Sequence, residues 1–463
     1  MGRRRTVHRC TSCGVATARW AGRCPACGEW NALREEAVAV AAERAGTGDP
    51  ATTVALCAVD VSGAAPCPTG LTELDRVLGG GLVPGSVTLL GGEPGVGKST
   101  LLLQVLRSVA LTGAVVVLVS AEESAAQVRL RAERLGPVPP TLLLLEATDV
   151  RAVGRCAAET TAALVVVDSI QAVADPDVVG LPGGVPQVRA CAEYLVRVAK
   201  VDQVPFVLVG HVTKDGALAG PRVLEHLVDT VMTVEGDRHH ALRMVRATKH
   251  RFGPTGELGL FTMGEAGLAA VTDPHSLLLG DRRPGTPGSA VLPAMEGQRA
   301  LLVEIQALWA PSPPSSPPRR SAQGVDSRRL ALLLAVLEQH GGVVLGHTDV
   351  FASAVGGIRV TEPAADLALA LALASAVTGR ALPVDVVAFG EVGLGGEIRQ
   401  VPHAPRRLSE AARIGFRRAL VPASCPDGPD GMELVRVASV EEAVVVALTD
   451  EHRGERRALR VTA

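Results

Sequence analysis

Ten residues in the first quarter of the chain restrict its fold more than any other segment. Residues 91–100 read GGEPGVGKST and contain the complete pattern G-x-x-x-x-G-K-[ST], from Gly92 to Ser99. An apolar run typical of a strand, 87–90, precedes the pattern, and one typical of a helix, 101–109, follows it. A strand, a glycine-rich loop and a helix in this order make up a phosphate-binding loop. The alternative is a simple glycine-rich turn, but a turn has no use for lysine and serine at its closing positions.

The residue types of the loop suit a nucleoside triphosphate. Gly92, Gly95 and Gly97 let the backbone turn so that successive N–H groups converge on phosphate oxygens at a helix N-terminus. Lys98 would supply a positive charge for the β- and γ-phosphates, and the Ser99 hydroxyl would ligate magnesium. The residues predicted to contact ATP in this loop are Gly92, Glu93, Pro94, Gly95, Val96, Gly97, Lys98, Ser99 and Thr100.

The chain around this loop alternates strand-like and helix-like segments. From about residue 70, short runs rich in valine and leucine are separated by helical stretches. This order predicts an α/β fold, with a mostly parallel sheet covered by helices on both faces. The expected strands are 87–90, 115–120, 142–146, 164–170 and 206–212, and a β-rich tail at 230–271 closes the unit.

Several strand ends carry polar residues suited to nucleotide hydrolysis. Asp168 ends an apolar run like a Walker B segment and would hold a magnesium-bound water beside Ser99, although an aspartate there is also a common helix cap. Glu122 is the candidate that orients the attacking water, with Glu123 close behind. An acidic first turn that stabilises the next helix would explain either glutamate. His211 is the candidate γ-phosphate sensor, and a structural histidine is the alternative.

Two C-x-x-C pairs, each followed by glycine, lie near the amino terminus. Their cysteines are Cys10, Cys13, Cys24 and Cys27. Each turn aims two thiolates at one point, and two turns complete a tetrahedral zinc site with no open position. A redox C-x-x-C is the alternative, but two pairs without a thioredoxin-like context favour a structural metal. Zinc would then supply much of the folding energy of a module of about 35 residues.

Composition restricts the ways in which the chain can bind other molecules. The 463 residues have a formal net charge of -2, so any nucleic-acid surface must be local. Only 2% of them are aromatic, which makes stacking on aromatic side chains a poor candidate for DNA binding. No apolar stretch has the length of a membrane span, and residues 1–5 lack a signal-peptide core. We therefore expect a cytoplasmic protein without a membrane partner.

Longer motifs carry a resemblance to a known family. Residues 69–85 (TGLTELDRVLGGGLVPG) lead into the loop, and residues 210–216 (GHVTKDG) and 219–226 (AGPRVLEH) follow an expected strand. Together with the four-cysteine head, these segments resemble the bacterial RadA/Sms DNA repair proteins almost from end to end. The resemblance implies a RecA-like P-loop ATPase that forms a homo-hexameric ring, with ATP between subunits and single-stranded DNA in the pore.

A further family motif, Lys-Asn-Arg-Phe-Gly, reads KHRFG at residues 249–253. Lys249 and Arg251 are two residues apart on an expected strand, so their side chains should point the same way. The resemblance implies that both reach the γ-phosphate in a neighbouring subunit. His250 replaces the family's asparagine and falls on the opposite face. It leaves the two cations intact and changes any contact that the family's asparagine makes.

The resemblance also implies that two loops line the pore, at 176–189 and 214–222. Their cations are Arg189, Lys214 and Arg222, which would contact DNA phosphates without reading sequence. The alternative for each is ordinary solvated surface charge.

The carboxyl-terminal part resembles the proteolytic domain of Lon, which RadA/Sms proteins also carry. The resembling blocks are 356–373 and 389–398, and apolar strands are expected at 301–308 and 330–337. We therefore expect an α+β domain after the ATPase core.

The catalytic residues of Lon are not matched in this domain. Lon-type proteases place their serine in a Gly-Pro-Ser-Ala-Gly run, whereas this chain has Glu362-Pro-Ala364-Ala-Asp366 at that place. Pro405 stands near the position of the activating lysine. Without a Ser-Lys dyad the domain has no chemistry for covalent peptide hydrolysis. We expect it to be a scaffold or a DNA surface.

These observations predict a domain order and a function. The expected limits are 1–34 for the zinc module, 35–66 for a linker, 67–272 for the ATPase domain, 273–287 for a second linker, 288–450 for the Lon-like domain and 451–463 for a tail. The expected activity is DNA-dependent ATP hydrolysis that drives movement along single-stranded DNA and branch migration in recombinational repair. The expected cofactors are ATP, Mg²⁺ and Zn²⁺, and the expected partners are single-stranded and branched DNA and a recombinase. Two alternatives are an ATP-dependent Lon-like protease and a non-motor nucleotide switch that resembles the circadian-clock ATPases.

Overall fold

Two compact units make up the structure, which is a computed structural model. It describes residues 6–10, 16–17, 20–25, 28–37, 53–210, 223–236, 241–313 and 317–449. The first unit spans Met1–Ser62 and the second spans Gly63–Ala463. The predicted site residues that lie outside the described residues are Cys13, Cys27, His211, Lys214 and Arg222.

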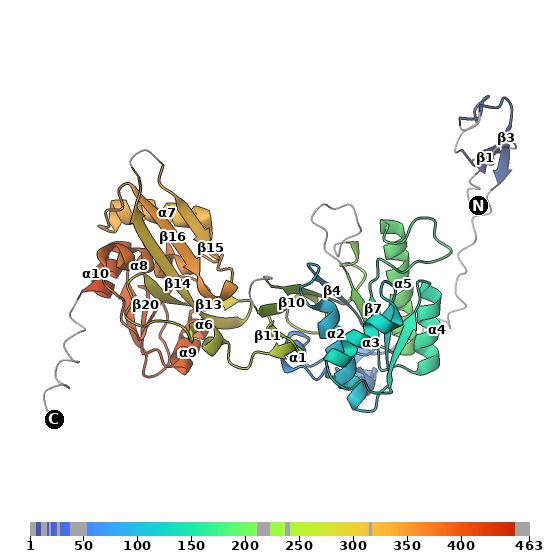
Figure 1. Ribbon diagram of the computed structural model, residues 1–463, viewed down its shortest axis with the longest axis horizontal. Coiled ribbons are helices and arrows are strands. Elements are labelled where there is room, and N and C mark those ends of the chain that lie inside the picture. The colour runs from blue at the N-terminus through green and yellow to red at the C-terminus, as the bar shows by residue number, and fades with distance from the viewer. Residues whose placement is uncertain are drawn as a thin grey trace. The chain divides into compact units, whose positions relative to one another are not determined.

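The first unit contains a small antiparallel sheet in the order β2-β1-β3 (Figure 1). Its strands are β1 (Thr6–Cys10), β2 (Ala16–Thr17) and β3 (Leu33–Ala37). Cys24, Ala32 and Leu33 form its buried cluster. A cluster of this size contributes little apolar burial to stability.

In the described part of the second unit, nine strands form one sheet in the order β12-β11-β10-β9-β4-β8-β7-β5-β6. The strands are β4 (Val87–Gly92), β5 (Val116–Ser120), β6 (Leu142–Glu146), β7 (Leu164–Asp168), β8 (Phe206–Val209), β9 (Thr230–Glu235), β10 (Leu242–His250), β11 (Leu258–Gly264) and β12 (Gly267–Ala270). Strands β4 to β9 pair in parallel, and β10 to β12 extend the sheet as an antiparallel tail. The expected strands therefore match this sheet within a few residues.

Helices cover both faces of this sheet (Figure 1). They are α1 (Thr72–Val77), α2 (Lys98–Leu111), α3 (Ala125–Arg134), α4 (Val150–Thr160) and α5 (Val185–Asp202). The neighbouring residues Leu89 and Leu90 of β4 point into different cores, because side chains alternate across a strand. The core that holds Leu90 includes residues of α2 and α3, and the other includes residues of α4 and α5. The predicted α/β class is confirmed.

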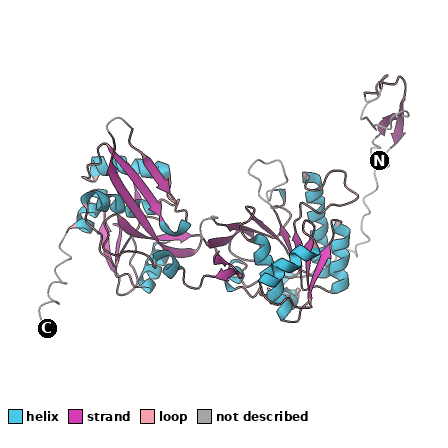
Figure 2. Cartoon of the chain, in the orientation of Figure 1, coloured by secondary structure: helices cyan, strands magenta, loops and turns pink. Residues whose placement is uncertain are grey.

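The carboxyl-terminal part of the second unit, from helix α6 to residue 449, combines helices with smaller sheets (Figure 2). One sheet has the order β13-β14-β16-β15, another has the order β17-β20-β21, and β18 pairs with β19. The strands are β13 (Ser289–Glu296), β14 (Arg299–Pro311), β15 (Arg320–Gln323), β16 (Thr348–Ala354), β17 (Val386–Ala388), β18 (Glu391–Val392), β19 (Ile398–Arg399), β20 (Arg418–Pro422) and β21 (Glu433–Val437). The helices are α6 (Pro274–Leu279), α7 (Ser327–His340), α8 (Ala365–Thr378), α9 (Ala404–Ile414) and α10 (Val440–Leu448).

The predicted strand at 330–337 is wrong, because these residues lie in helix α7. The Asp326 carboxylate accepts hydrogen bonds from the backbone N–H groups of Arg328 and Arg329 and caps the helix. The buried positions 330, 333, 334 and 337 recur at helical spacing. A short apolar run by itself does not distinguish a buried helix from a strand.

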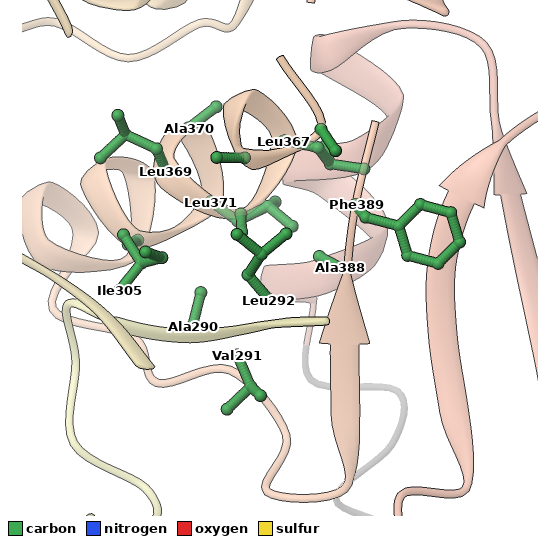
Figure 3. Packing of buried hydrophobic residues seen from close by; sticks show 14 of the residues in the cluster. Ala290, Val291, Leu292, Ile305, Leu367, Leu369, Ala370, Leu371, Ala388 and Phe389 are labelled. Atoms are coloured by element: carbon green, nitrogen blue, oxygen red, sulfur yellow. The ribbon is translucent and has the colours of Figure 1, made fainter. Parts of the chain in front are cut away.

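Helix α8 forms the centre of the carboxyl-terminal domain. All its residues from Ala365 to Ser375 are buried, as expected for a helix surrounded by protein. Figure 3 shows α8 lying over β13 and β14, with apolar side chains such as Leu371 and Leu292 between them. No helix in the described ranges has the length and apolar character needed to cross a membrane.

Candidate nucleotide-binding site

The candidate site lies where neighbouring parallel strands end. Ser120, at the end of β5, is the register partner of Asp168, at the end of β7. The loop after β4 leads directly into α2, which begins at Lys98. A cavity at this edge is lined by Ser99, Leu118, Ser120, Glu122, Glu123, Val128, Arg131 and Asp168. The topology thus gathers polar groups from three separate sequence segments.

Glycine is required at two positions of the loop. Gly97 caps α2 with a φ of +110°, a left-handed conformation that other residues rarely adopt. A Cβ atom at Gly92 would lie 2.6 Å from the carbonyl oxygen of Val234. The backbone therefore makes the turn that a phosphate cradle requires.

Lys98 is almost completely buried, with 4% of its surface exposed. Its Nζ donates hydrogen bonds to the carbonyl oxygens of Gly92 (2.9 Å) and Glu93 (3.1 Å). Burial lowers the pKa of Lys98, and the carboxylates of Asp168 and Glu122 act in the opposite direction. The Lys98 ammonium group therefore interacts electrostatically with the carboxylates of both Asp168 and Glu122.

The two candidate glutamates have different partners. Glu122 Oε1 accepts a hydrogen bond of 2.5 Å from the hydroxyl of Ser169, the residue that follows Asp168. Glu123 instead forms an ion pair of 2.8 Å with Arg131. The alternative of an acidic first turn does not apply, because α3 begins at Ala125 and both glutamates precede its cap. The structure therefore brings Glu122 to the end of β7 and directs Glu123 to Arg131.

Sequence reasoning missed Ser169, which is fully buried beside this site. Its hydroxyl hydrogen-bonds Glu122 across 47 positions of sequence. The sequence does show a serine directly after Asp168, at the end of the strand. Its hydrogen-bond partner could not be predicted, because the partner depends on how the loop after β5 meets the loop after β7.

Lys249 and Arg251 lie away from the P-loop of their own chain. Lys249 pairs with Val231 near the beginning of β9, whereas Gly92 pairs with Val234. Lys249 Nζ donates to the carbonyl oxygen of Val228 (2.7 Å), and Arg251, just after β10, forms an ion pair of 3.1 Å with Asp229. Burial, and then the Arg251 cation, lower the pKa of Lys249. Lys249 and Arg251 therefore both contact the segment just before β9, at residues 228–229.

His250 has separate partners. Its Nδ1 lies 2.9 Å from the Thr230 hydroxyl and its Nε2 lies 3.2 Å from the Leu78 carbonyl oxygen. Because a carbonyl only accepts, Nε2 carries the proton and Nδ1 accepts from Thr230. Burial lowers the pKa of His250, which favours this neutral ring.

The predicted loop position of Arg189 is wrong, because Arg189 lies in helix α5. Gly184 caps this helix and Pro186 stands in its first turn, where proline suits a helix start. The Arg189 side chain is 63% exposed and forms a 2.8 Å ion pair with Glu193.

Two predicted zinc ligands are described, Cys10 and Cys24. The backbone N–H of Gly28 donates to the Cys24 carbonyl oxygen (2.9 Å), and Gly28 has a φ of +77°. Cys10 pairs with Leu33, and Leu33 also packs with Cys24. The tight glycine-closed turn that follows Cys24 is the backbone geometry that a C-x-x-C-G zinc turn requires.

In the carboxyl-terminal domain, Ala364 is buried (1% exposed) and precedes α8. Pro405 lies in the first turn of α9. The segments of these two residues are joined by an ion pair of 2.5 Å between Arg407 and Glu362. Arg407 is 1% exposed and also donates to the Pro293 carbonyl oxygen at 2.7 Å. An ion pair between the buried Arg407 and the partly exposed Glu362 therefore holds this region together.

The strand order, the P-loop and the carboxylates at the sheet edge define a RecA-like P-loop ATPase. A family model described as an AAA domain matches residues 51–217, and one described as a rubredoxin metal binding domain matches residues 8–35. The predicted nucleotide-binding and zinc-binding modules are thus supported by separate matches.

Comparison with whole proteins identifies the family. DNA repair protein RadA of Mycobacterium tuberculosis H37Rv is 48% identical over 461 residues, which cover 98% of this chain and 96% of that protein. RadA of Bacillus subtilis 168 is 44% identical, covering 95% and 98%, and RadA of Escherichia coli K12 is 46% identical, covering 94% and 97%. The chain belongs to the RadA family of DNA repair proteins, as the sequence motifs predict.

A solved structure of a KaiC-like protein from Pyrococcus horikoshii OT3 is 21% identical and covers 45% of this chain and 99% of its own. The TM-score of this match is 0.39.

Proposed function

We propose that this chain is a DNA-dependent ATPase that moves along single-stranded DNA and promotes branch migration of recombination intermediates. The observation that carries the proposal is the group of Lys98, Ser99, Glu122 and Asp168 at one edge of the sheet. Membership of a DNA repair family supports DNA as the partner. Branched DNA and a recombinase would be partners in the same process.

The side chains at the sheet edge have complementary roles in ATP hydrolysis. Lys98 binds the β- and γ-phosphates, helped by the backbone N–H groups of the loop. Magnesium, held by Ser99 and through a water by Asp168, would neutralise charge on the phosphates. Glu122 orients the attacking water, and its hydrogen bond with Ser169 fixes its direction. His211 would act as the γ-phosphate sensor.

Lys249 and Arg251 act on the nucleotide of a neighbouring subunit in a ring, which we propose is a hexamer. Within one chain the strand register leaves them away from the P-loop, and this supports a role across an interface. Two cations held against the same segment would stabilise the charge that develops on the transferred phosphoryl group.

Arg189, Lys214 and Arg222 contact the DNA backbone. For Arg189, the ion pair with Glu193 lies at the surface, and such a pair contributes only about 0–1 kcal/mol. A DNA phosphate can therefore replace the glutamate at little cost. Contacts of this kind bind DNA without reading its sequence.

The cysteines Cys10, Cys13, Cys24 and Cys27 hold one structural zinc ion in this proposal. The domains would follow the limits 1–34, 67–272 and 288–450, and the protein would act in the cytoplasm. The Ala364 methyl group supports a carboxyl-terminal domain that does not cleave peptides. Metal analysis of the protein with and without a Cys24→Ser substitution tests the zinc site.

Phosphate release with and without single-stranded DNA tests the ATPase proposal, and a fluorescent branched substrate tests movement. We expect stimulation by DNA and ATP-dependent branch migration, both lost in Lys98→Ala. Absence of DNA stimulation would instead favour a non-motor switch. Stimulated hydrolysis without branch migration would refute the proposed motor, and ATP-dependent casein degradation would refute the scaffold role of the last domain.

A further inference from the structure

Strands β10 and β11 serve two cores at once. Along β10, Val245 and Ala247 join the ATPase core that includes α2. The alternate residues Leu242 and Met244 join the core of the carboxyl-terminal domain, together with β11 residue Leu260. Because side chains alternate across a strand, strands β10 and β11 present one face to each of the two domains. We call this strand pair, residues 242–250 and 258–264, the shared wall.

One face of the wall contacts the P-loop. Arg243 of β10 is 6% exposed, and its Nε donates a 3.1 Å hydrogen bond to the carbonyl oxygen of Val96. A Cβ atom at Gly97 would lie 2.5 Å from the Cε of Met263, which belongs to β11. The antiparallel tail is thus packed directly against the loop that precedes Lys98.

The contact at Val96 affects how the loop presents its donors. The Val96 carbonyl and the Gly97 N–H belong to one planar trans peptide unit, so they point in opposite directions. By holding the carbonyl, Arg243 directs the Gly97 N–H away from the wall. Backbone N–H groups of this loop are the donors that a phosphate requires.

Ion pairs join the carboxyl-terminal domain to Arg246 on the other face of the strand pair and to helix α1, which packs beside β11. Arg246 of β10 pairs with Glu296 of β13 at 2.9 Å. Arg299 of β14 pairs at 2.6 Å with Glu73 of α1, and the same carboxylate accepts the N–H of Leu260 at 2.9 Å. A shift of the β13–β14 hairpin would therefore move the wall.

We propose that the carboxyl-terminal domain controls the affinity of the P-loop for nucleotide through β10 and β11, with Arg243 as the positioning residue. This inference rests on the proposed nucleotide site and adds a means of regulating it. A partner or DNA bound by the carboxyl-terminal domain would thereby change ATP binding in the same chain, and ATP would change that partner's affinity equally.

The test measures binding of a fluorescent ATP analogue to full-length variants, without DNA. Arg243→Met keeps the buried chain and removes the donor, and we expect its Kd to rise on the order of tenfold, which corresponds to about 1.4 kcal/mol. Arg243→Lys retains a charged donor and should recover part of the loss. Arg246→Gln removes the ion pair with Glu296, together with a 3.4 Å ion pair with Glu235 of β9, and should raise the Kd about threefold without touching the loop.

The double variant Arg243→Met/Arg246→Gln should bind the analogue no more weakly than Arg243→Met. Once Arg243 no longer contacts the P-loop, the loss of the Arg246 ion pair cannot affect the loop through β10. Arg129→Gln is the matched control: it removes an exposed ion pair with Glu133 on α3 and should leave the Kd unchanged. Thermal unfolding confirms that each variant is folded.

Independent, multiplying effects of the two substitutions, or an unchanged Kd in Arg246→Gln, would overturn the inference. Equal losses of affinity for the analogue in Arg243→Met and Arg243→Lys would overturn the role of the hydrogen-bond donor at position 243. If the wild-type chain does not bind the analogue, the nucleotide site itself is refuted, which is a distinguishable result.

Discussion

Replacement of Glu122 by glutamine tests the hydrolytic site most directly. Glu122→Gln preserves the size of the side chain and its ability to accept the Ser169 hydrogen bond. It removes the negative charge that, in the proposed function, orients and activates a water molecule. The substitution therefore separates the chemistry of the carboxylate from its packing.

The expected loss of turnover is about 10²- to 10⁴-fold, the usual contribution of a general base. At 1.36 kcal/mol per factor of ten, this is about 3 to 5 kcal/mol of the activation barrier. ATP binding should persist, since Lys98 and the loop are unchanged. Stability should change by no more than about 0.5 kcal/mol, because Glu122 lies at the surface of the site. Phosphate release at saturating ATP, with single-stranded DNA, measures the rate.

Glu123→Gln is the matched control at the next position. It loses the partly exposed ion pair with Arg131, which costs about 0–1 kcal/mol of stability, and its turnover should stay near that of the wild type. The reasoning is refuted if Glu123→Gln loses the activity while Glu122→Gln keeps it.

The remaining predictions concern the loop, a histidine and the ion pair of the buried Arg407. Lys98→Ala removes the buried ammonium group and should abolish ATP turnover while the protein stays folded, as phosphate release and thermal unfolding measure. Burial lowers the pKa of His250 in the folded protein. The contribution of neutral His250 to stability is therefore complete above the unfolded-state pKa of about 6.5 and declines as the pH falls below that value. Urea unfolding at several pH values should show that the stability of His250→Asn depends less on acid than that of the wild type. Arg407→Met leaves Glu362 without its cation and should destabilise the carboxyl-terminal domain by about 3 kcal/mol, measured by calorimetry; a change below about 1 kcal/mol would contradict a structural role for the pair.

Local patterns were sufficient to predict much of this molecule. The P-loop at 92–99 depends on glycines, a lysine and a serine that are close in sequence, so its backbone can be anticipated from residue types alone. The parallel strands follow from short apolar runs separated by helical stretches. The same rule failed at 330–337, because a continuous apolar run suits a buried helix as well as a strand.

The sequence by itself determined the phosphate-binding loop, the C-x-x-C pairs that precede it, and the presence of alanine at position 364 and proline at position 405. Only the tertiary structure decided that Glu122 meets Ser169 while Glu123 meets Arg131, and that Arg243 holds a loop 147 positions earlier in the chain. The physical reason is that local backbone preferences depend on neighbouring residues. The partner of a buried polar side chain is instead set by which strands and loops the whole fold brings together.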